Sequence, residues 1–274
     1  MLEIGIVETR NIIKTILEKY NYDFSDYSLT SFKRRLEKIM DQQNLKNVDQ
    51  LITKLRDNNS YFEQFLDELA TPSTEMFRDP SLWRILRDEL LPSLIRDSGS
   101  NLKIWLPNSV SGDELFSLLI ILYELNQLDK VQIYVSSLSA RSIDTIRSGL
   151  MLAGKIDLST DNYIRANGID VFPKYYKTEN NTIYRDTSLI KNVIFSRQNM
   201  SLDPPVQGIK LVLFRNKMIY YNQTLQSKVL RQLFSFLVPN GFLIVGTKES
   251  INTFYGNNEF SLINSSESIY KRKP

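Results

Sequence analysis

Polar and charged residues that could hold a ligand are concentrated in four short segments of the chain. These segments are residues 74–80, 107–114, 195–199 and 213–221. Each has a simple interpretation by itself: a surface ion pair, a helix that begins with two acids, or a turn after a strand. Three of them begin at the end of an apolar run, and the ends of parallel strands meet at one edge of a sheet. Together they predict a ligand-binding cleft at that edge.

The chemistry open to these residues is limited, because the chain has no histidine and no cysteine. Ser-His-Asp and Cys-His nucleophilic systems are excluded, as are zinc sites with nitrogen or sulfur ligands and disulfides. Any catalysis must use carboxylates, Tyr, Lys, Arg, hydroxyls, the backbone or a cofactor, and we expect no metal. The net charge of +3, from 34 basic and 31 acidic residues, does not indicate a nucleic-acid partner.

The chain of 274 residues, 42% of them hydrophobic, is long enough to bury a sizeable core in one large or two smaller domains. Its longest apolar run, residues 115–122, is shorter than the roughly 18 residues that a membrane helix needs. The N-terminus has no basic region followed by an apolar block. These features predict a cytoplasmic protein without membrane insertion. Nothing indicates an obligate dimer, so we expect a monomer.

Residues 1–70 are predicted to form an all-helical N-terminal domain. Four apolar stripes recur at helical spacing, and Ser60 and Glu63 have the spacing of a capping box before the fourth stripe. Basic residues gather in the second helix, at Lys33, Arg34, Arg35 and Lys38. Residues 71–100 are predicted as a linker, marked by Thr-Pro-Ser at 71–73, and a helix that follows Pro80.

From residue 101 to 274, short apolar strands alternate with helices, which favours a mostly parallel sheet with helices on both faces. Strands are expected at residues 102–106, 131–135, 192–195, 210–214 and 242–245, and helices from 113, around 139–147 and around 224–237. A turn is predicted at 239–241, and strands at 260–264 and 268–271 are close enough to pair antiparallel. A small β insertion is predicted at about 171–185, with Asn180 and Asn181 at its turn.

The sequence resembles the CheR family of chemotaxis receptor methyltransferases over nearly its whole length. The most specific matches are Thr-Glu-Met-Phe-Arg-Asp-Pro at 74–80, Ser-Gly-Asp-Glu at 111–114, Arg-Asn-Lys-Met-Ile-Tyr at 215–220 and Gly-Thr-Lys-Glu-Ser at 246–250. The resemblance implies an α/β fold: a doubly wound, Rossmann-like methyltransferase sheet with an antiparallel C-terminal strand, a small inserted β-hairpin and an all-α N-terminal domain. It implies S-adenosylmethionine (SAM) as cofactor, S-adenosylhomocysteine (SAH) as product, and methyl transfer to glutamate side chains of chemoreceptors.

The resemblance also implies roles for individual residues. Those matched to the cofactor site are Thr74, Arg78, Gly112, Glu114, Ser137, Asn199, Met200, Arg215 and Asn216. Those matched to catalytic positions near the reacting methyl group are Arg78, Arg215 and Tyr220. Those matched to the helix that faces the receptor's methylation helices are Arg34, Arg35 and Lys38.

The implied reaction suits a chain without histidine. A glutamate carboxylate is already ionised near neutral pH, so it needs no general base to attack a sulfonium methyl group. The enzyme has to hold the nucleophile, the carbon and the sulfur in line and to exclude water. Arginine can orient the carboxylate by charge-assisted hydrogen bonds, and Tyr220 can donate one more. We therefore expect these residues to position the substrate.

The sequence departs from the family pattern in the expected cofactor site. Ser137 stands where the family has an acid that accepts hydrogen bonds from the ribose, a loss of about 1–3 kcal/mol. Leu106, Pro107 and Asn108 replace small residues in the turn after the first strand. Three hypotheses therefore remain: an active methyltransferase, a weak or inactive relative that acts as a binding module, and a methyltransferase for another substrate.

The β insertion carries a further expectation. In the family, such an insertion can bind a short peptide tethered to the receptor's C-terminus. The turn predicted at 178–182 is short and has no glycine. We expect tethered-peptide docking to be absent, which leaves recognition to the basic helix and the rim of the catalytic domain.

Overall fold

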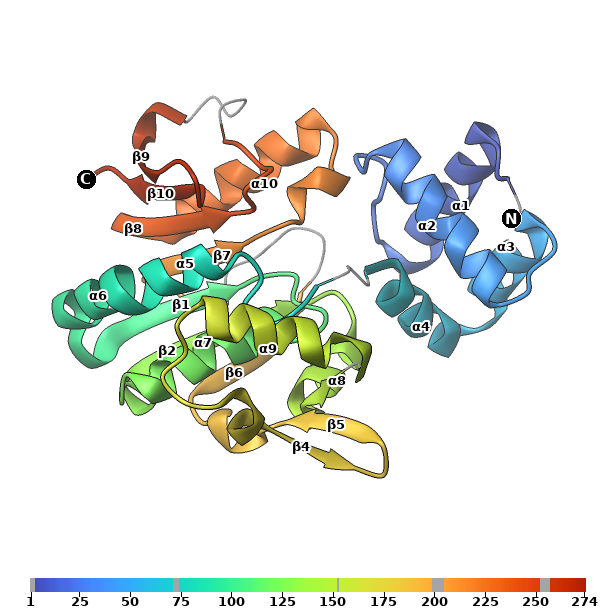
Figure 1. The fold of residues 1–274 in the computed structure, drawn as a ribbon. Helices are drawn as coiled ribbons and strands as arrows, with labels where there is room; N and C mark the ends of the chain where they lie inside the picture. The colour runs from blue at the N-terminus through green and yellow to red at the C-terminus, as the bar shows by residue number, and fades with distance from the viewer. Residues whose placement is uncertain (1–2, 71–73, 152, 199–204, 252–256) are drawn as a thin grey trace.

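The computed structural model describes residues 3–70, 74–151, 153–198, 205–251 and 257–274. A helical unit lies beside a larger α/β unit (Figure 1). The helical unit contains α1 (Ile6–Tyr20), α2 (Leu29–Gln42), α3 (Val48–Asp57) and α4 (Asn59–Ala70). Its core includes fully buried Leu36 and Phe65, which belong to the second and fourth predicted stripes. The first predicted stripe is only partly right, because Ile13 is buried but Ile6 and Leu17 are exposed. The predicted linker at 71–73 lies outside the described residues.

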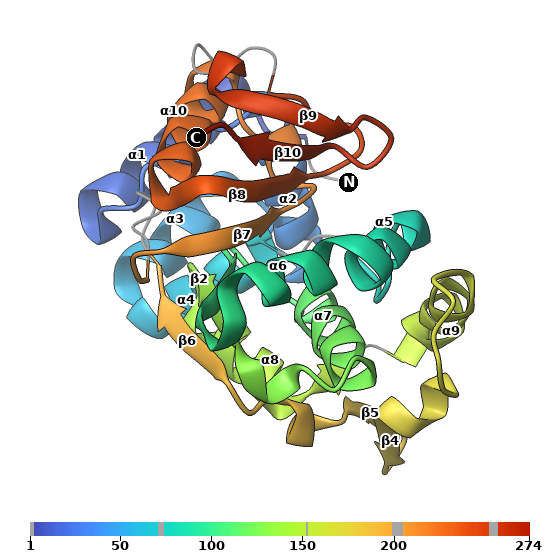
Figure 2. The ribbon, with the colours of Figure 1, turned by 90° about the vertical axis from the view of Figure 1, so that its left-hand side faces the viewer.

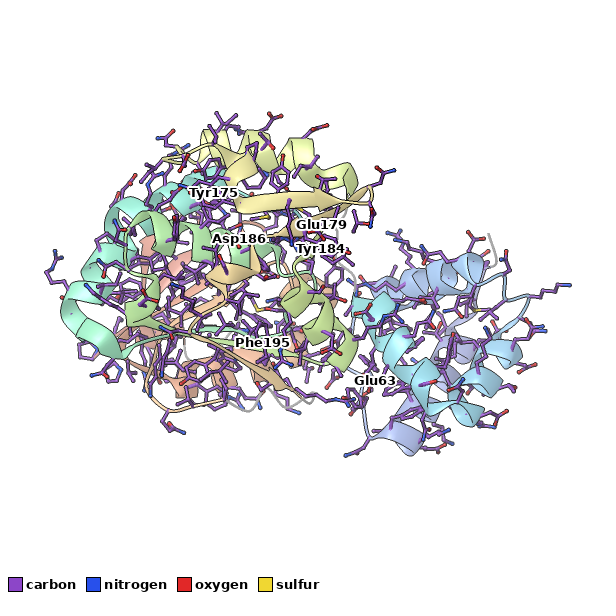
Figure 3. All side chains as sticks on the ribbon, turned by 90° about the horizontal axis from the view of Figure 1, so that it is seen from below. Glu63, Tyr175, Glu179, Tyr184, Asp186 and Phe195 are labelled. Carbon is purple, nitrogen blue, oxygen red and sulfur yellow. The ribbon has the colours of Figure 1, made fainter. Side chains whose placement is uncertain are left out.

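The predicted capping box at Ser60 is wrong by two residues. Helix α4 begins at Asn59, and the backbone N–H of Tyr61 donates to Asn58 Oδ1 at 3.1 Å. Glu63 does not turn back toward the helix start. Its carboxylate instead accepts from the Ala140 N–H at 3.3 Å and from Arg197. Figure 3 shows Glu63 where the helical unit meets the α/β unit. Glu63 therefore makes contacts between the two units and not the predicted capping contact at the start of α4.

Seven strands form the main sheet in the order β6-β2-β1-β7-β8-β10-β9. Their bounds are β1 Leu102–Leu106, β2 Val131–Ser137, β6 Val193–Arg197, β7 Ile209–Phe214, β8 Leu237–Val245, β9 Phe260–Asn264 and β10 Ile269–Arg272. The strands from β6 to β8 are parallel, and β10 is antiparallel to both of its neighbours. Figure 2 shows β7, β8, β10 and β9 side by side. The predicted sheet is confirmed.

Helices cover both faces of this sheet because alternate strand residues point to opposite sides. The larger helices are α5 Pro80–Ile85, α6 Leu91–Ser98, α7 Asp113–Glu124, α8 Ala140–Ser148, α9 Ile156–Arg165 and α10 Gln223–Phe236, with a π-helical turn at Leu86–Leu90. Ile104 and Leu106 share one core with α5, α6 and α7. Trp105 shares the other core with α10. The sheet is therefore doubly wound, as predicted.

Short 3₁₀ turns connect several of these elements. They lie at Gly99–Asn101, Leu128–Lys130, Ala153–Lys155, Phe172–Tyr175, Thr187–Leu189, Met218–Tyr220 and Asn257–Glu259. The turn predicted at 239–241 is instead part of β8, because that strand continues from Leu237 to Val245. The pairing of β8 with β7 shifts register there, from Ile209↔Leu237 to Leu211↔Phe242. Residues 239–241 therefore form an irregularity within β8 and not a separate turn.

The small β insertion has its predicted hairpin, β4 (Tyr176–Glu179) and β5 (Thr182–Arg185). Asn180 and Asn181 both have positive φ, 48° and 60°, so asparagine supplies the left-handed turn that glycine often makes. The structure adds two elements that the sequence analysis did not predict. Strand β3 (Leu150–Met151) completes a three-stranded sheet, and α9 precedes the hairpin. Figure 3 labels Tyr175, Glu179, Tyr184 and Asp186 of this region on the α/β unit.

Candidate active site

A cavity lies at the carboxyl ends of the parallel strands, as the sequence predicted. Its walls come from the turn after β1, the end of β2, the segment after β7 and the loop that precedes α5. The helical unit contributes Tyr27, Arg35 and Ala70. The cavity is therefore built from both units of the chain.

Arg215 lines this cavity and directly follows β7. Its side chain is 1% exposed. Its Nη1 donates to Glu114 Oε1 at 3.2 Å, and Nη2 donates to Asp79 and to the Arg78 carbonyl. Arg215 therefore joins the start of α7 to the loop before α5. Asp79 was not among the predicted site residues, although it lies within the matched segment 74–80.

The loop before α5 is held in an unusual conformation. Phe77 and Asp79 have φ values of 54° and 58°, which are rare for residues with side chains. The Phe77 N–H donates to Ser117 Oγ at 2.8 Å, and Trp83 Nε1 donates to the Arg78 carbonyl at 2.8 Å. Such strain persists where surrounding contacts enforce it, often at functional sites. The loop presents Thr74 and Arg78 to the cavity.

Lys217 is a cavity residue that the sequence analysis did not single out. Its Nζ donates to the Pro107 carbonyl at 2.5 Å and lies 3.8 Å from Glu114 Oε2. Burial lowers the pKa of Lys217, and the Glu114 carboxylate opposes that shift. Glu114 therefore faces two cations, Arg215 and Lys217. The available signal was its place within the matched segment 215–220, between Arg215 and Tyr220.

The three basic residues predicted for substrate binding do not share one surface. Arg34 and Lys38 are exposed, one helical turn apart on α2. Arg35 instead lines the cavity, its guanidinium 3.9 Å from the centroid of the Tyr220 ring. It also donates to the Leu69 carbonyl. The grouping of Arg35 with Arg34 and Lys38 is therefore corrected, because successive helical residues are about 100° apart.

Tyr220 and its neighbours are fixed by the helical unit. The Ser28 N–H donates to the Tyr220 carbonyl at 2.8 Å, and the Asn222 N–H donates to the Asp26 carbonyl at 2.9 Å. Tyr27 and Tyr221 form an antiparallel bridge. Burial raises the pKa of Tyr27 to about 12 and raises that of Tyr221 well above its ordinary value. Both phenols therefore stay neutral at physiological pH.

Glu249 organises the segment from which Arg215 and Tyr220 project. Its carboxylate accepts backbone N–H groups of Asn216, Met218, Ile219 and Gly246, at 2.6–3.2 Å. The side chain lies in the matched segment 246–250 but was not assigned a role. A Cβ at Gly246 would lie 2.6 Å from Asn216 Oδ1, so glycine is required for this close approach.

We expect Glu249→Gln to lower the free energy of unfolding by about 2–4 kcal/mol, because an amide NH₂ would face backbone donors and leave N–H groups unpaired. Urea unfolding followed by circular dichroism measures this. Glu259→Gln, at an exposed carboxylate, is the matched control and should change stability by no more than about 0.5 kcal/mol. Equal stability of the two variants would contradict the role assigned to Glu249.

The other predicted cofactor residues have mixed outcomes. Ser137, at the end of β2, lines the cavity and is 2% exposed, and its carbonyl accepts from the Gln198 N–H at 2.7 Å. Gly112 lines it as the N-cap of α7 with φ 77°, and Asn216 lines it with φ 57°. Asn199 and Met200 lie outside the described residues.

The cavity fits SAM on two structural observations. A Cβ at Gly112 would lie 3.2 Å from Ile146 Cγ2, and its positive φ disfavours other residues, so the turn before α7 stays bare of side chain there. The buried Oδ1 of Asn108 has no hydrogen-bond partner among the described residues and lies on the cavity wall. A ligand with polar groups would satisfy it.

The fold and the cavity together define a SAM-dependent methyltransferase. The SAM-binding domain of the CheR methyltransferases matches residues 72–269, and their all-alpha domain matches residues 8–70. The chain therefore belongs to the CheR methyltransferase family.

Two relatives by sequence agree with this assignment. A Pseudomonas putida protein named as a methyltransferase, Cher3, is 31% identical over 97% of both chains. The chemotaxis protein methyltransferase Cher2 of the same organism is 25% identical over 80% of this chain and 81% of its own. Among solved structures, the N-methyltransferase NodS of Bradyrhizobium japonicum with SAH superposes with a TM-score of 0.40 and 10% identity, over 74% of this chain and 90% of its own.

The described residues were also compared with the requirements of a metal site and of a membrane-spanning helix. They contain no group of three or more acidic side chains arranged to hold a metal ion. None of their helices is both long enough and apolar enough to span a bilayer.

Proposed function

We propose that this chain transfers the methyl group of SAM to glutamate side chains of chemoreceptors, forming glutamyl methyl esters. The observation that carries the proposal is the convergence of Arg35, Arg78, Arg215 and Tyr220 on one cavity. Three guanidinium groups and a phenol suit an anionic acceptor. Relatives named as chemotaxis protein methyltransferases support the same substrate class.

In this proposal the cofactor is held by residues from five segments of the chain. They are Thr74, Arg78, Gly112, Glu114, Ser137, Asn199, Met200, Arg215 and Asn216. When bound, SAM supplies an electrophilic methyl group on its sulfonium. Glu114 suits the cofactor's ammonium group, and Arg78 its carboxylate. Arg215 is itself held by Asp79 and Glu114, so it is preorganised before any ligand enters.

The chain's own residues then position the acceptor. Arg78 and Arg215 orient its carboxylate, and Tyr220 donates a hydrogen bond to the oxygen that does not attack. No residue has to remove a proton, because the acceptor is already ionised. The helical unit closes one wall of the cavity and helps to exclude water. Catalysis is therefore mainly by proximity and orientation.

The exposed pair Arg34 and Lys38 would meet the acidic face of the receptor helices, while Arg35 acts inside the cavity. Residues 1–70 form the receptor-facing domain in this proposal, 71–100 the linker and helix, and 101–274 the methyltransferase domain. A monomer in the cytoplasm suffices for this arrangement.

We expect Tyr220→Phe to slow methyl transfer about ten- to hundredfold, because one hydrogen bond to a charged group is lost. The assay incubates the protein with radiolabelled SAM and receptor cytoplasmic fragments and counts methanol released by alkali, which reports carboxyl esters. SAH affinity should be unchanged in this variant. Label that resists alkali would overturn the glutamate assignment, and full activity of Tyr220→Phe would overturn the role of Tyr220.

A second candidate function is a binding module that has lost catalysis. Ser137 at the end of β2 favours it, because a serine replaces the charged acceptor expected there. Calorimetric titration with SAM and SAH separates the two. Binding of either ligand supports the methyltransferase, whereas no binding at millimolar ligand supports the module, which should then capture a receptor fragment without cofactor.

A further inference from the structure

Asn108, two residues after the end of β1, places a carboxamide on the cavity wall. Its φ is 51°, a left-handed conformation that asparagine tolerates better than most residues. The next residue, Ser109, donates its N–H to the Ser136 carbonyl at 2.8 Å. Asn108 therefore lies beside the end of β2, on the same cavity as Ser137.

The orientation of the carboxamide follows from its neighbours. Asn108 Nδ2 donates to the Tyr221 hydroxyl at 3.3 Å. The Tyr221 hydroxyl is in turn hydrogen-bonded to Tyr27. A phenol has a single proton, and if Tyr221 donates it to Tyr27, its oxygen is left to accept from Asn108. The Oδ1 atom of Asn108 is then the side-chain atom left over, and it is buried with no partner among the described residues.

The end of β2 offers no carboxylate that could serve as an acceptor. In doubly wound folds, the residue near the end of the second strand that binds the ribose hydroxyls is typically an acid. Here the strand ends in Ser136 and Ser137, and the Ser136 hydroxyl is already used by Trp105 Nε1 at 3.0 Å and by Gln198. A vicinal diol entering the cavity at this level would meet Asn108 Oδ1, a buried acceptor that no described residue uses.

We propose that Asn108 Oδ1 accepts a hydrogen bond from a ribose hydroxyl of the cofactor, and so replaces the missing acid with a neutral group. The inference rests on the proposed function, since it requires that SAM or SAH binds. The proposal also assigns a role to the Asn108 side chain, which narrows the cavity compared with a smaller residue at this position.

The test is a calorimetric titration of SAH and of its 2′,3′-dideoxy analogue into three proteins: wild type, Asn108→Gly and Asn108→Asp. Glycine accepts the positive φ, so Asn108→Gly removes the side chain without backbone strain. We expect it to weaken SAH binding about tenfold and to leave affinity for the dideoxy analogue unchanged. Asn108→Asp retains an acceptor and should bind SAH more tightly than Asn108→Gly. Asn126→Gly, at an exposed asparagine with φ 56°, is the matched control.

The outcomes separate this inference from the proposed function. Unchanged or tighter SAH binding by Asn108→Gly would overturn the inference, as would an equal loss for the dideoxy analogue. Failure of the wild-type chain to bind SAM or SAH would overturn the proposed function together with the inference. If Asn108→Gly loses affinity for SAH but not for the dideoxy analogue, the result supports the inference.

Discussion

Arg215→Ala is expected to abolish detectable methyl transfer and to lower the free energy of unfolding by about 2–4 kcal/mol. The side chain is 1% exposed and pairs with Asp79 and Glu114. Its removal takes from Asp79 the cation with which it pairs and leaves Glu114 facing Lys217 alone. We expect a smaller loss of unfolding free energy than for a fully buried ion pair, because Asp79 is 30% and Glu114 is 17% exposed.

Two controls separate the catalytic part of this effect from the structural part. Arg215→Lys keeps the charge but lacks the planar fork that reaches both carboxylates, so we expect partial recovery of stability without recovery of activity. Arg141→Ala breaks a surface pair at 3.9 Å, with Arg141 62% exposed, and should leave stability nearly unchanged. Urea unfolding and the alkali-labile methyl assay measure both quantities. Wild-type activity in Arg215→Ala would refute the assignment of Arg215.

Arg185→Ala is expected to lower the free energy of unfolding by about 3–5 kcal/mol, because it leaves the Asp113 carboxylate buried and unpaired. The two side chains are 2% and 3% exposed and form an ion pair. Arg185 also donates to the Leu150 carbonyl at 2.6 Å and lies over the Phe116 ring. The desolvation of Arg185 lowers its pKa, although Asp113 opposes the shift.

This pair connects the small three-stranded sheet to the first residue of α7, next to Gly112 and Glu114. Its loss should therefore weaken SAH binding as well as stability. A double-mutant cycle with Asp113→Asn measures the coupling, and we expect the double variant to be more stable than the sum of single losses predicts. Lys174→Ala, at an exposed ion pair in the same insertion, should cause no measurable change. Additive single losses would show that the pair is not coupled.

Much of the architecture could be predicted from the sequence because it depends on local pattern. Helical and strand periods are properties of neighbouring residues, so the helices of residues 1–70 and the alternation after residue 101 were evident. The Asn180-Asn181 turn was identified for the same reason. Helix α9 was missed, and residues 239–241 were predicted as a turn although they lie within β8.

By itself, the sequence determined the chemistry: a chain without histidine and cysteine, with polar residues at the ends of parallel strands and motifs matched from 74 to 250. Only the tertiary structure decided which side chains meet. It turned Arg35 inward onto Tyr220 while Arg34 and Lys38 stayed in solvent, and it placed Lys217 against Glu114. It also paired Asp113 with Arg185, 72 residues away. The physical reason is that these contacts depend on how separate elements pack, and the local periods of a sequence do not specify which residues of two distant segments will touch.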